Sequence, residues 1–229
     1  MKTVIKIGGA WLEEPARVIE TVRNALNSPT VIVHGGGIQI TRMLEKMNKP
    51  SKFVDGLRVT DEATLHAVRL ALLGEVHSQL VQTLQAAGLP VVGAFGAVRA
   101  RQKDGPWGFV GTCVEADAEL LGALLAIRRI PVIPTLAIGA DSSLNVNGDA
   151  TATAVAIAIR ANRLTFMTDV PGVKDEAGTV IHHVSNVDQL LAASFVSGGM
   201  LPKLRAVKTA MTAGVRFVQV GGTVFEAVS

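Results

Sequence analysis

Two apolar segments near the start of the chain each end in a cluster of glycines. Residues 4–10 read VIKIGGA and residues 31–37 read VIVHGGG. Glycine at the end of a strand lets the backbone approach a ligand closely, because it carries no side chain. A helix pattern follows each cluster, so its first amide groups direct positive charge at that ligand. Two such turns predict a chain that folds around two anionic groups, and phosphate is the first expectation.

Strand and helix patterns alternate along the rest of the chain. Strands are expected at 2–7, 30–34, 89–94, 130–134, 164–168 and 215–220, and a hairpin at 95–116. Helices are expected at 13–26, 38–47, 61–87, 117–127, 149–161, 186–193 and 201–213. This alternation predicts an α/β fold with a mostly parallel sheet covered on both faces. Ligands of such sheets bind at the carboxyl ends of the strands, where both glycine clusters fall.

The sequence also predicts the ends of one helix and the role of one connecting segment. The helix at 61–87 is expected to have Asp61 or Thr60 as its cap and to end at Gly88. The segment around 135–150 is expected to join two lobes that each hold one ligand.

Composition limits the class of protein. The 229 residues are 48% hydrophobic and 18% charged, as in a globular domain with a large core. No apolar run reaches about 18 residues, and the first residues lead into a strand, so neither a membrane span nor a signal peptide is expected. A cytoplasmic location is therefore the expectation. A net charge of +3, 4% aromatic residues and no Tyr argue against a nucleic-acid partner. Cys113, the only cysteine, excludes an internal disulfide and a thiolate metal cluster.

Several common nucleotide and metal motifs are absent. The chain has no G-x-x-x-x-G-K-[ST], no G-x-G-x-x-G and no H-E-x-x-H. His182 and His183 are expected on a surface strand, so no metal site is predicted. Phosphoryl transfer needs mainly positioned cations and amide groups, and none of these motifs is required for it. This reaction therefore remains a candidate.

Charged and polar residues near the glycine turns are the candidates for that chemistry. Lys6 precedes the first glycine pair by two residues. Arg58, in the turn DGLRVT at 55–60, has the planar guanidinium that binds a carboxylate through two hydrogen bonds. Asn145, Asn147 and Asp149 alternate before a helix, so they either project to one side as ligands or form a turn with a capping Asp.

These motifs together resemble the amino acid kinase family. They are K-x-G-G, H-G-G-G, D-G-L-R-V-T, N-V-N-x-D, T-D-V-P-G and G-G-M-x-x-K, in this order from Lys6 to Lys203. The resemblance implies a three-layer αβα sandwich with a mostly parallel central sheet in one domain, 1–229. It further implies an N-terminal lobe, about 1–140, for acyl-amino-acid binding and dimerisation, and a C-terminal lobe, about 141–229, for ATP.

The resemblance also implies an activity. G-L-R-V-T favours the branch that transfers the ATP γ-phosphoryl group to the side-chain carboxylate of N-acetyl-L-glutamate in arginine biosynthesis, with Mg²⁺ carried by the nucleotide. It disfavours the uridylate, carbamate, aspartate and glutamate 5-kinase branches. A carboxylate with a pKa of about 4.3 is ionised near neutral pH and attacks phosphorus without a general base. The lack of a catalytic histidine motif therefore fits this reaction.

The family's functional positions map onto residues of this chain. By resemblance, Lys6 and Lys203 neutralise the transferring group and Asp149 orients both lysines. The implied acceptor-binding residues are Gly35, Gly36, Arg58, Asn145 and Asn147. The implied ATP-binding residues are Gly8, Gly9, Thr168, Asp169, Gly172, Val196 and Ser197.

Two departures from the family pattern leave alternatives open. The segment 95–116 is compressed, and 75–78 reads EVHS where an Asn-Lys pair is common. Arg99, Arg101 and Lys103 suit a kinase that phosphorylates aminoadipate or glutamate attached to an acidic carrier protein. A catalytically inactive ligand-binding relative is the other alternative. Because no extension precedes the first strand, the resemblance predicts a homodimer without arginine feedback instead of a hexamer.

Overall fold

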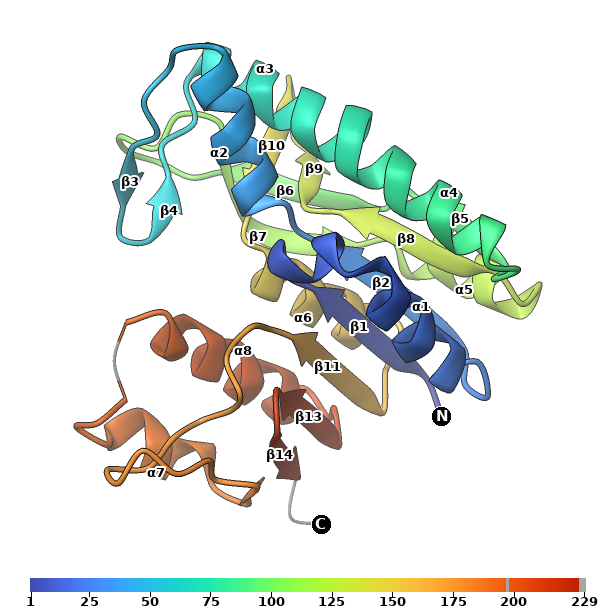
Figure 1. The fold of residues 1–229 in the computed structure, drawn as a ribbon, viewed down its shortest axis with the longest axis vertical. Helices are drawn as coiled ribbons and strands as arrows, with labels where there is room; N and C mark the ends of the chain where they lie inside the picture. Colours follow the sequence, from blue (N-terminus) through green and yellow to red (C-terminus); the bar gives the residue numbers. More distant parts are fainter. Residues whose placement is uncertain (197, 227–229) are drawn as a thin grey trace.

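The centre of the molecule is an eight-stranded sheet (Figure 1). The computed structural model describes residues 1–196 and 198–226. The strand order is β12-β14-β13-β11-β1-β2-β8-β5, and every neighbouring pair is parallel except β13 and β14. The strands are β1 Thr3–Ile7, β2 Thr30–His34, β5 Val91–Gly93, β8 Ile130–Pro134, β11 Arg163–Met167, β12 His183–Val184, β13 Phe217–Val220 and β14 Thr223–Glu226. The mostly parallel sheet predicted from the sequence is confirmed.

Helices cover both faces of this sheet. On one face lie α1 (Pro15–Asn24) and α4 (Ser78–Ala86), whose apolar residues join a core with Ile5 and Ile7 of β1. On the other face α5 (Ala118–Ala126), α6 (Gly148–Ala158), α7 (Val187–Ala192) and α8 (Met200–Thr212) share a core with Val4. This arrangement is the expected three-layer sandwich.

The alternation of side chains along β1 determines the face of the sheet on which Lys6 lies. Successive side chains of a strand point to opposite faces, so Lys6 shares the face of Val4 and not that of Ile5 and Ile7. Val4 packs on the side of α6. Lys6 therefore extends from the carboxyl end of β1 toward the N-terminus of α6.

A four-stranded closed barrel stands beside the main sheet. β6 (Val98–Gln102) and β7 (Val110–Ala116) form the antiparallel hairpin predicted at 95–116. They close with β9 (Leu136–Ile138) and β10 (Ser143–Val146), which the sequence pattern did not reveal. The segment 135–150 thus contains a strand pair that packs on the hairpin, and the division into two lobes remains a prediction.

The segment between β2 and β5 is mostly helical. It contains α2 (Gly37–Lys46), then a short hairpin of the two-residue strands β3 (Phe53–Val54) and β4 (Leu57–Arg58). After the hairpin come α3 (Glu62–Arg69), a π-helix (Leu70–His77) and α4. Asp61 caps α3 by accepting a 2.8 Å hydrogen bond from the Thr64 amide, as expected. Gly88 follows α4 with a left-handed φ of +78°, so the predicted end is also confirmed. Asp55 and Gly56 both have positive φ, as the tight turn between β3 and β4 requires.

A short 3-10 helix, Ala10–Glu13, follows the first glycine turn. β12 carries His183 at the surface, as expected, whereas β14 was not predicted. Among the described residues, the helices are all too short or too polar to cross a membrane.

Candidate active site

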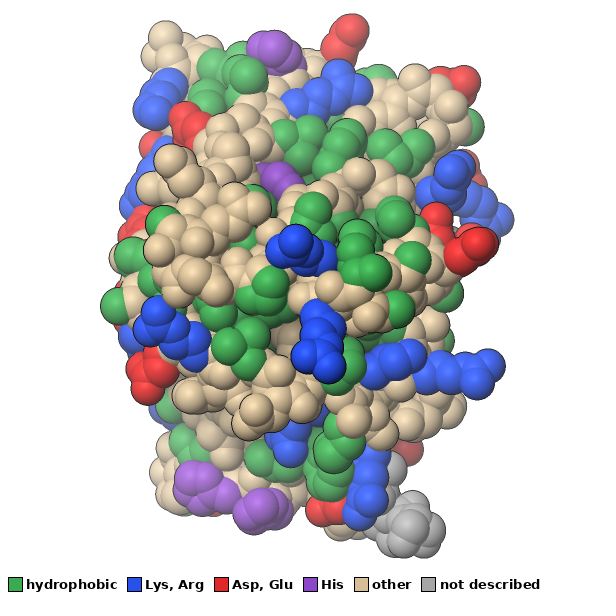
Figure 2. All heavy atoms as spheres, turned by 90° about the vertical axis from the view of Figure 1, so that its right-hand side faces the viewer, with side chains coloured by type: hydrophobic (Ala, Val, Ile, Leu, Met, Phe, Trp, Pro, Cys, Tyr) green, Lys and Arg blue, Asp and Glu red, His purple; other side chains and the backbone are tan. Residues whose placement is uncertain are grey.

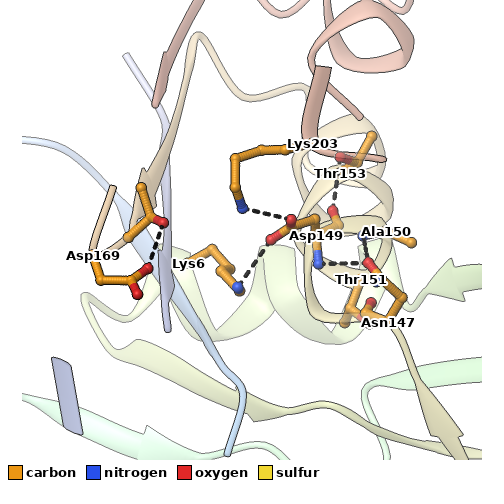
Figure 3. A network of polar contacts seen from close by, with 9 residues as sticks. Lys6, Asn147, Asp149, Ala150, Thr151, Thr153, Asp169 and Lys203 are labelled. Carbon is orange, nitrogen blue, oxygen red and sulfur yellow. Dashed lines mark hydrogen bonds and ion pairs between the residues drawn. The ribbon is translucent and has the colours of Figure 1, made fainter. Parts of the chain in front are cut away.

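Two lysines from opposite ends of the chain meet at one aspartate (Figure 3). Lys6 comes from β1, Asp149 from the first turn of α6, and Lys203 from the first turn of α8. Lys203 Nζ donates a 2.7 Å hydrogen bond to Asp149 Oδ2. Lys6 Nζ lies 2.9 Å from Asp149 Oδ1 in an ion pair that lacks the alignment of a hydrogen bond. The structure therefore brings the three predicted catalytic residues together.

This cluster is largely shielded from solvent and carries net positive charge. The side chains of Lys6, Asp149 and Lys203 are only 15%, 14% and 12% exposed. Burial raises the pKa of Asp149, but the ammonium groups of Lys6 and Lys203 outweigh this effect and hold the pKa below its ordinary value. Asp149 is thus ionised at neutral pH. Two ammonium groups beside one carboxylate leave one positive charge, which favours an anionic ligand.

The N-terminus of α6 holds Asp149 in place. Asn147 Oδ1 accepts hydrogen bonds of 2.9 Å from the amides of Asp149 and Ala150. The capping residue is therefore Asn147, and Asp149 is left to face the lysines. Gly148 leaves room for the Lys6 stem, because a Cβ on Gly148 would lie 3.0 Å from Lys6 Cε.

The two glycine turns lie side by side at the carboxyl ends of β1 and β2. The Gly8 amide donates to the Met167 carbonyl at 3.1 Å, and the Gly35 amide donates to the Ile7 carbonyl at 3.0 Å. Gln39 Nε2, from α2, donates to the Gly9 carbonyl at 3.2 Å and so ties the second turn to the first. Sequence reasoning missed Gln39, although its place in the first turn of the helix after H-G-G-G is a usable signal.

A cavity of about 540 Å³ opens on one side of Lys6 and is called here the donor cavity. It holds predicted ATP-binding residues and both catalytic lysines. Its lining is Lys6, Gly8, Gly9, Ala10, Trp11, Ile38, Met167, Thr168, Asp169, Val170, Gly199, Met200 and Lys203. Thr168 Oγ1 donates to Asp169 Oδ1 at 3.2 Å within this wall.

A smaller cavity of about 220 Å³ opens on the other side and is called the acceptor cavity. It gathers all five predicted acceptor-binding residues. Its lining is Lys6, Gly9, Gly35, Gly36, Gly37, Ile40, Phe53, Gly56, Leu57, Arg58, Val110, Thr135, Asn145, Val146, Asn147 and Gly148. Lys6 and Gly9 line both cavities, so the two spaces meet at these two residues.

Arg58 is a nearly buried cation in the acceptor cavity. Its Nη2 donates to the Gly37 carbonyl at 3.0 Å and to Thr41 Oγ1 at 2.9 Å, and its Nη1 donates to Ser51 Oγ. The guanidinium also lies over the Phe53 ring, 4.7 Å from its centroid. Burial lowers the pKa of Arg58. No carboxylate of the described residues forms an ion pair with Arg58, so its charge is available to an acid in the cavity.

The remaining predicted residues lie near these cavities or outside the described chain. Asn145 Nδ2 donates to Thr60 Oγ1 at 3.1 Å, which orients its amide beside the acceptor cavity. Gly172 and Val196 line a third cavity of about 290 Å³ that shares Val170 and Met200 with the donor cavity. Ser197 lies outside the described residues.

A larger cavity adjoins the donor cavity and shares Thr168 and Asp169 with it. It measures about 770 Å³ and opens beside α1, β11 and β13. Neither Lys6 nor Lys203 belongs to its lining. Size therefore does not identify the reacting centre, whereas the convergence of Lys6, Asp149 and Lys203 does.

Comparison with known proteins addresses the family of this chain. The model of the amino acid kinase family matches residues 1–222. This chain belongs to the amino acid kinase family. An acetylglutamate kinase of Acidobacterium capsulatum is 40% identical over 96% of this chain and 90% of its own. Another, from Methanopyrus kandleri, is 40% identical over 93% of this chain and 92% of its own.

One solved structure has a very similar fold. The crystal structure of smu.665 from Streptococcus mutans matches with a TM-score of 0.90 and 30% identity, and covers 99% of both chains. The amino acid kinase resemblance seen in the motifs is thereby confirmed, as is the α/β fold.

Proposed function

We propose that this protein is an acetylglutamate kinase. It transfers the γ-phosphoryl group of ATP to the side-chain carboxylate of N-acetyl-L-glutamate, giving N-acetyl-L-glutamyl 5-phosphate and ADP in arginine biosynthesis. The observation that carries the proposal is that the donor and acceptor cavities share Lys6, whose ammonium group pairs with Asp149 beside Lys203. Two relatives of that name, each 40% identical over more than nine-tenths of this chain, support it.

The chain's own residues account for the transfer. The acceptor carboxylate is already ionised, so one of its oxygens bonds to the γ-phosphorus while the bond to the β-phosphate oxygen breaks and ADP leaves. Lys6, at the junction of the cavities, neutralises charge on the side of the acceptor. Lys203 neutralises charge on the side of the leaving ADP. Asp149 holds both ammonium groups in position, so little reorganisation is needed during the reaction.

The donor cavity suits a nucleotide that brings its own metal ion. Asp169 is the single carboxylate in that lining, and the described residues contain no group of three or more His, Cys, Asp or Glu side chains that would hold a metal. When bound on the phosphates, Mg²⁺ would neutralise part of their charge. Gly8 and Gly9 offer backbone close to the phosphates, and Thr168, Asp169, Gly172 and Val196 contact the rest of ATP.

The acceptor cavity suits a small dicarboxylate derivative. Arg58 binds the α-carboxylate, since it is a shielded cation with no acidic partner among the described residues. Asn145 and Asn147 contact the acyl-amino portion, and Gly35 and Gly36 border the carboxylate that receives phosphate. A cavity of about 220 Å³ leaves no room for a carrier protein's bulk, so a carrier-bound substrate would have to enter by its tip. The names of the relatives do not favour that alternative.

We also propose that the protein is a cytoplasmic homodimer. Figure 2 shows the face at the right-hand side of Figure 1, where hydrophobic side chains gather between Lys and Arg side chains. Phe95, after the edge strand β5, and Leu120, on α5, are 44% and 41% exposed. Light scattering after size exclusion should give twice the 24.0 kDa chain mass, whereas a monomer mass would contradict the dimer.

An acceptor panel tests the proposed activity. Purified enzyme with ATP and Mg²⁺ should release ADP with free N-acetyl-L-glutamate, and hydroxylamine should trap the acyl phosphate as a hydroxamate. Carrier-bound aminoadipate or glutamate, carbamate and uridylate should give little turnover. Faster turnover with the carrier-bound substrate would replace the proposal, and binding of ATP and acetylglutamate without ADP release would indicate an inactive relative.

A further inference from the structure

Two histidines that the reaction does not use lie behind the acceptor cavity. His34 is the last residue of β2, and His77 is the last residue of the π-helix. His34 Nε2 lies 3.0 Å from His77 Nδ1, and His34 Nδ1 lies 2.9 Å from the Gly35 carbonyl oxygen. The ring centroids are 5.2 Å apart. These contacts form a chain from the π-helix to the second glycine turn.

The carbonyl at the end of this chain determines where the protons lie. A carbonyl oxygen only accepts, so His34 must carry its proton on Nδ1 and leave Nε2 as an acceptor. His77 must therefore donate from its own Nδ1. Complete burial lowers the pKa of His34 to about 3, so its ring is neutral at physiological pH. Burial lowers the pKa of His77 as well.

The Gly35 carbonyl belongs to the same peptide group as the Gly36 amide. A trans peptide is planar, and its C=O and N–H point in opposite directions. His34 holds the carbonyl on its own side, so the Gly36 N–H is directed away from His34, and Gly36 lines the acceptor cavity. Within the described part of the chain, the Gly36 amide donates to no acceptor.

The π-helix packs tightly against this turn from behind. A Cβ on Gly36 would lie 2.6 Å from Leu72 Cδ2 and 3.5 Å from Val76 Cγ2. On the far side of His77, a Cβ on Gly93 would lie 2.6 Å from His77 Nε2. The imidazole of His77 is therefore held between His34 and the backbone of Gly93.

We propose that His77 is a positioning residue that acts through His34 and the Gly35 carbonyl to aim the Gly36 N–H at the carboxylate of the acceptor. This inference rests on the proposed function and extends it, because it assigns a task to two residues that touch neither substrate. A hydrogen bond to a charged oxygen is strong enough that its misalignment changes affinity by roughly tenfold.

Two variants of His77 separate positioning from simple packing. His77→Leu fills similar space but cannot donate, whereas His77→Asn keeps an amide N–H near the place of Nδ1. His77→Leu should raise the KM for acetylglutamate roughly tenfold and leave the KM for ATP within about twofold, and His77→Asn should restore most of the loss. Ser78→Ala, at the neighbouring exposed position, is the control and should match wild type.

If His77→Leu does not fold, a third variant and an NMR spectrum of the wild-type enzyme test the same hydrogen-bond chain. Gly93→Ala pushes the His77 ring from the other side and should reproduce the selective rise in KM. The ¹⁵N spectrum of labelled imidazoles in wild-type enzyme should show His34 protonated at Nδ1.

The outcomes distinguish this proposal from the proposed function. A wild-type enzyme without turnover on acetylglutamate rejects the function, and His34 protonated at Nε2 rejects the hydrogen-bond chain. An unchanged KM in His77→Leu, or equal losses in His77→Leu and His77→Asn, rejects the positioning role.

Discussion

Asp149 offsets the electrostatic repulsion between two lysines that serve the same phosphoryl group. Two ammonium groups close enough to serve one phosphoryl group repel each other, and both lose hydration when they are shielded. A carboxylate between Lys6 and Lys203 offsets that repulsion and fixes the direction of each side chain. It does so without cancelling the net positive charge, which remains for the phosphates.

Removal of either lysine should abolish most turnover while the fold survives. Lys6→Ala and Lys203→Ala are each expected to lower kcat by about 10²–10³, the usual cost of losing one preorganised charge at a reacting group. Steady-state ADP release and circular dichroism measure the two effects. Lys208→Ala is the matched control, because Lys208 lies on the same helix and pairs with Asp188 in an exposed contact of 2.6 Å. A wild-type kcat in either active-site variant would refute its role.

Arg58 should act on affinity more than on rate. Arg58→Ala is expected to raise the KM for acetylglutamate by at least tenfold, since a charge-assisted pair is lost. The KM for ATP should change little, because Arg58 lines only the acceptor cavity. Substrate-dependence curves for both ligands check this, and an equal rise in the two KM values would contradict it.

At the scale of elements, the helical segment between β4 and β5 shows how packing modifies a local pattern. The sequence predicts one helix over 61–87, and the ends at Asp61 and Gly88 agree. Its middle, Leu70–His77, is a π-helix, a form that occurs often at functional sites. Leu72 and Val76 there approach Gly36, and His77 reaches His34. These contacts with the glycine turn leave no trace in the hydrophobic periodicity of the sequence. They are the basis of the positioning role proposed for His77.

The cap of α3 should contribute pH-dependent stability. A hydrogen bond from Lys49 and others from Thr64 lower the pKa of Asp61 from 3.8 to about 2. Because the folded pKa is depressed, this stabilisation is complete above about pH 4 and is lost as the pH falls toward 2. Asp61→Ala should cost about 1 kcal/mol of unfolding free energy at pH 7, and less near pH 2.

Urea denaturation at several pH values measures this effect. Asp61→Asn keeps a capping oxygen without a charge, so it should retain most stability at pH 7 and show no such dependence between pH 4 and 2. An alanine variant as stable as wild type at pH 7 would exclude the capping contribution.

At the scale of the whole molecule, the sheet order assembles the site. β1 lies between β2 and β11, so the first glycine turn has the second turn on one side and the 168–172 segment on the other. The donor cavity and the acceptor cavity lie on either side of Lys6 as a consequence. Binding in one cavity therefore need not disturb the contacts that form the other.

Ligand-induced stabilisation should reveal two separable sites. A ligand at a hundred times its Kd stabilises the folded state by about 2.7 kcal/mol, so ATP with Mg²⁺ and acetylglutamate should each raise the melting temperature. Differential scanning fluorimetry of Arg58→Ala should lose the shift from acetylglutamate and keep the shift from the nucleotide. Loss of both shifts would show that the cavities are not independent.

The sequence by itself determined the features that depend on local chemistry. The strands at 2–7 and 30–34, the glycine turns after them, the cap at Asp61 and the ordered motifs follow from side-chain alternation and from what each backbone position permits. The short strands β9, β10 and β14 were not predicted, because three or four residues carry too little periodicity.

Only the tertiary structure decided which distant residues touch. Asn147 proved to be a cap, Gln39 a tie between the glycine turns, and His77 the partner of His34. Arg58 proved to be shielded from solvent without an acidic partner among the described residues. These facts depend on strand order and on packing across the sheet, since residues far apart in sequence meet only when both are set.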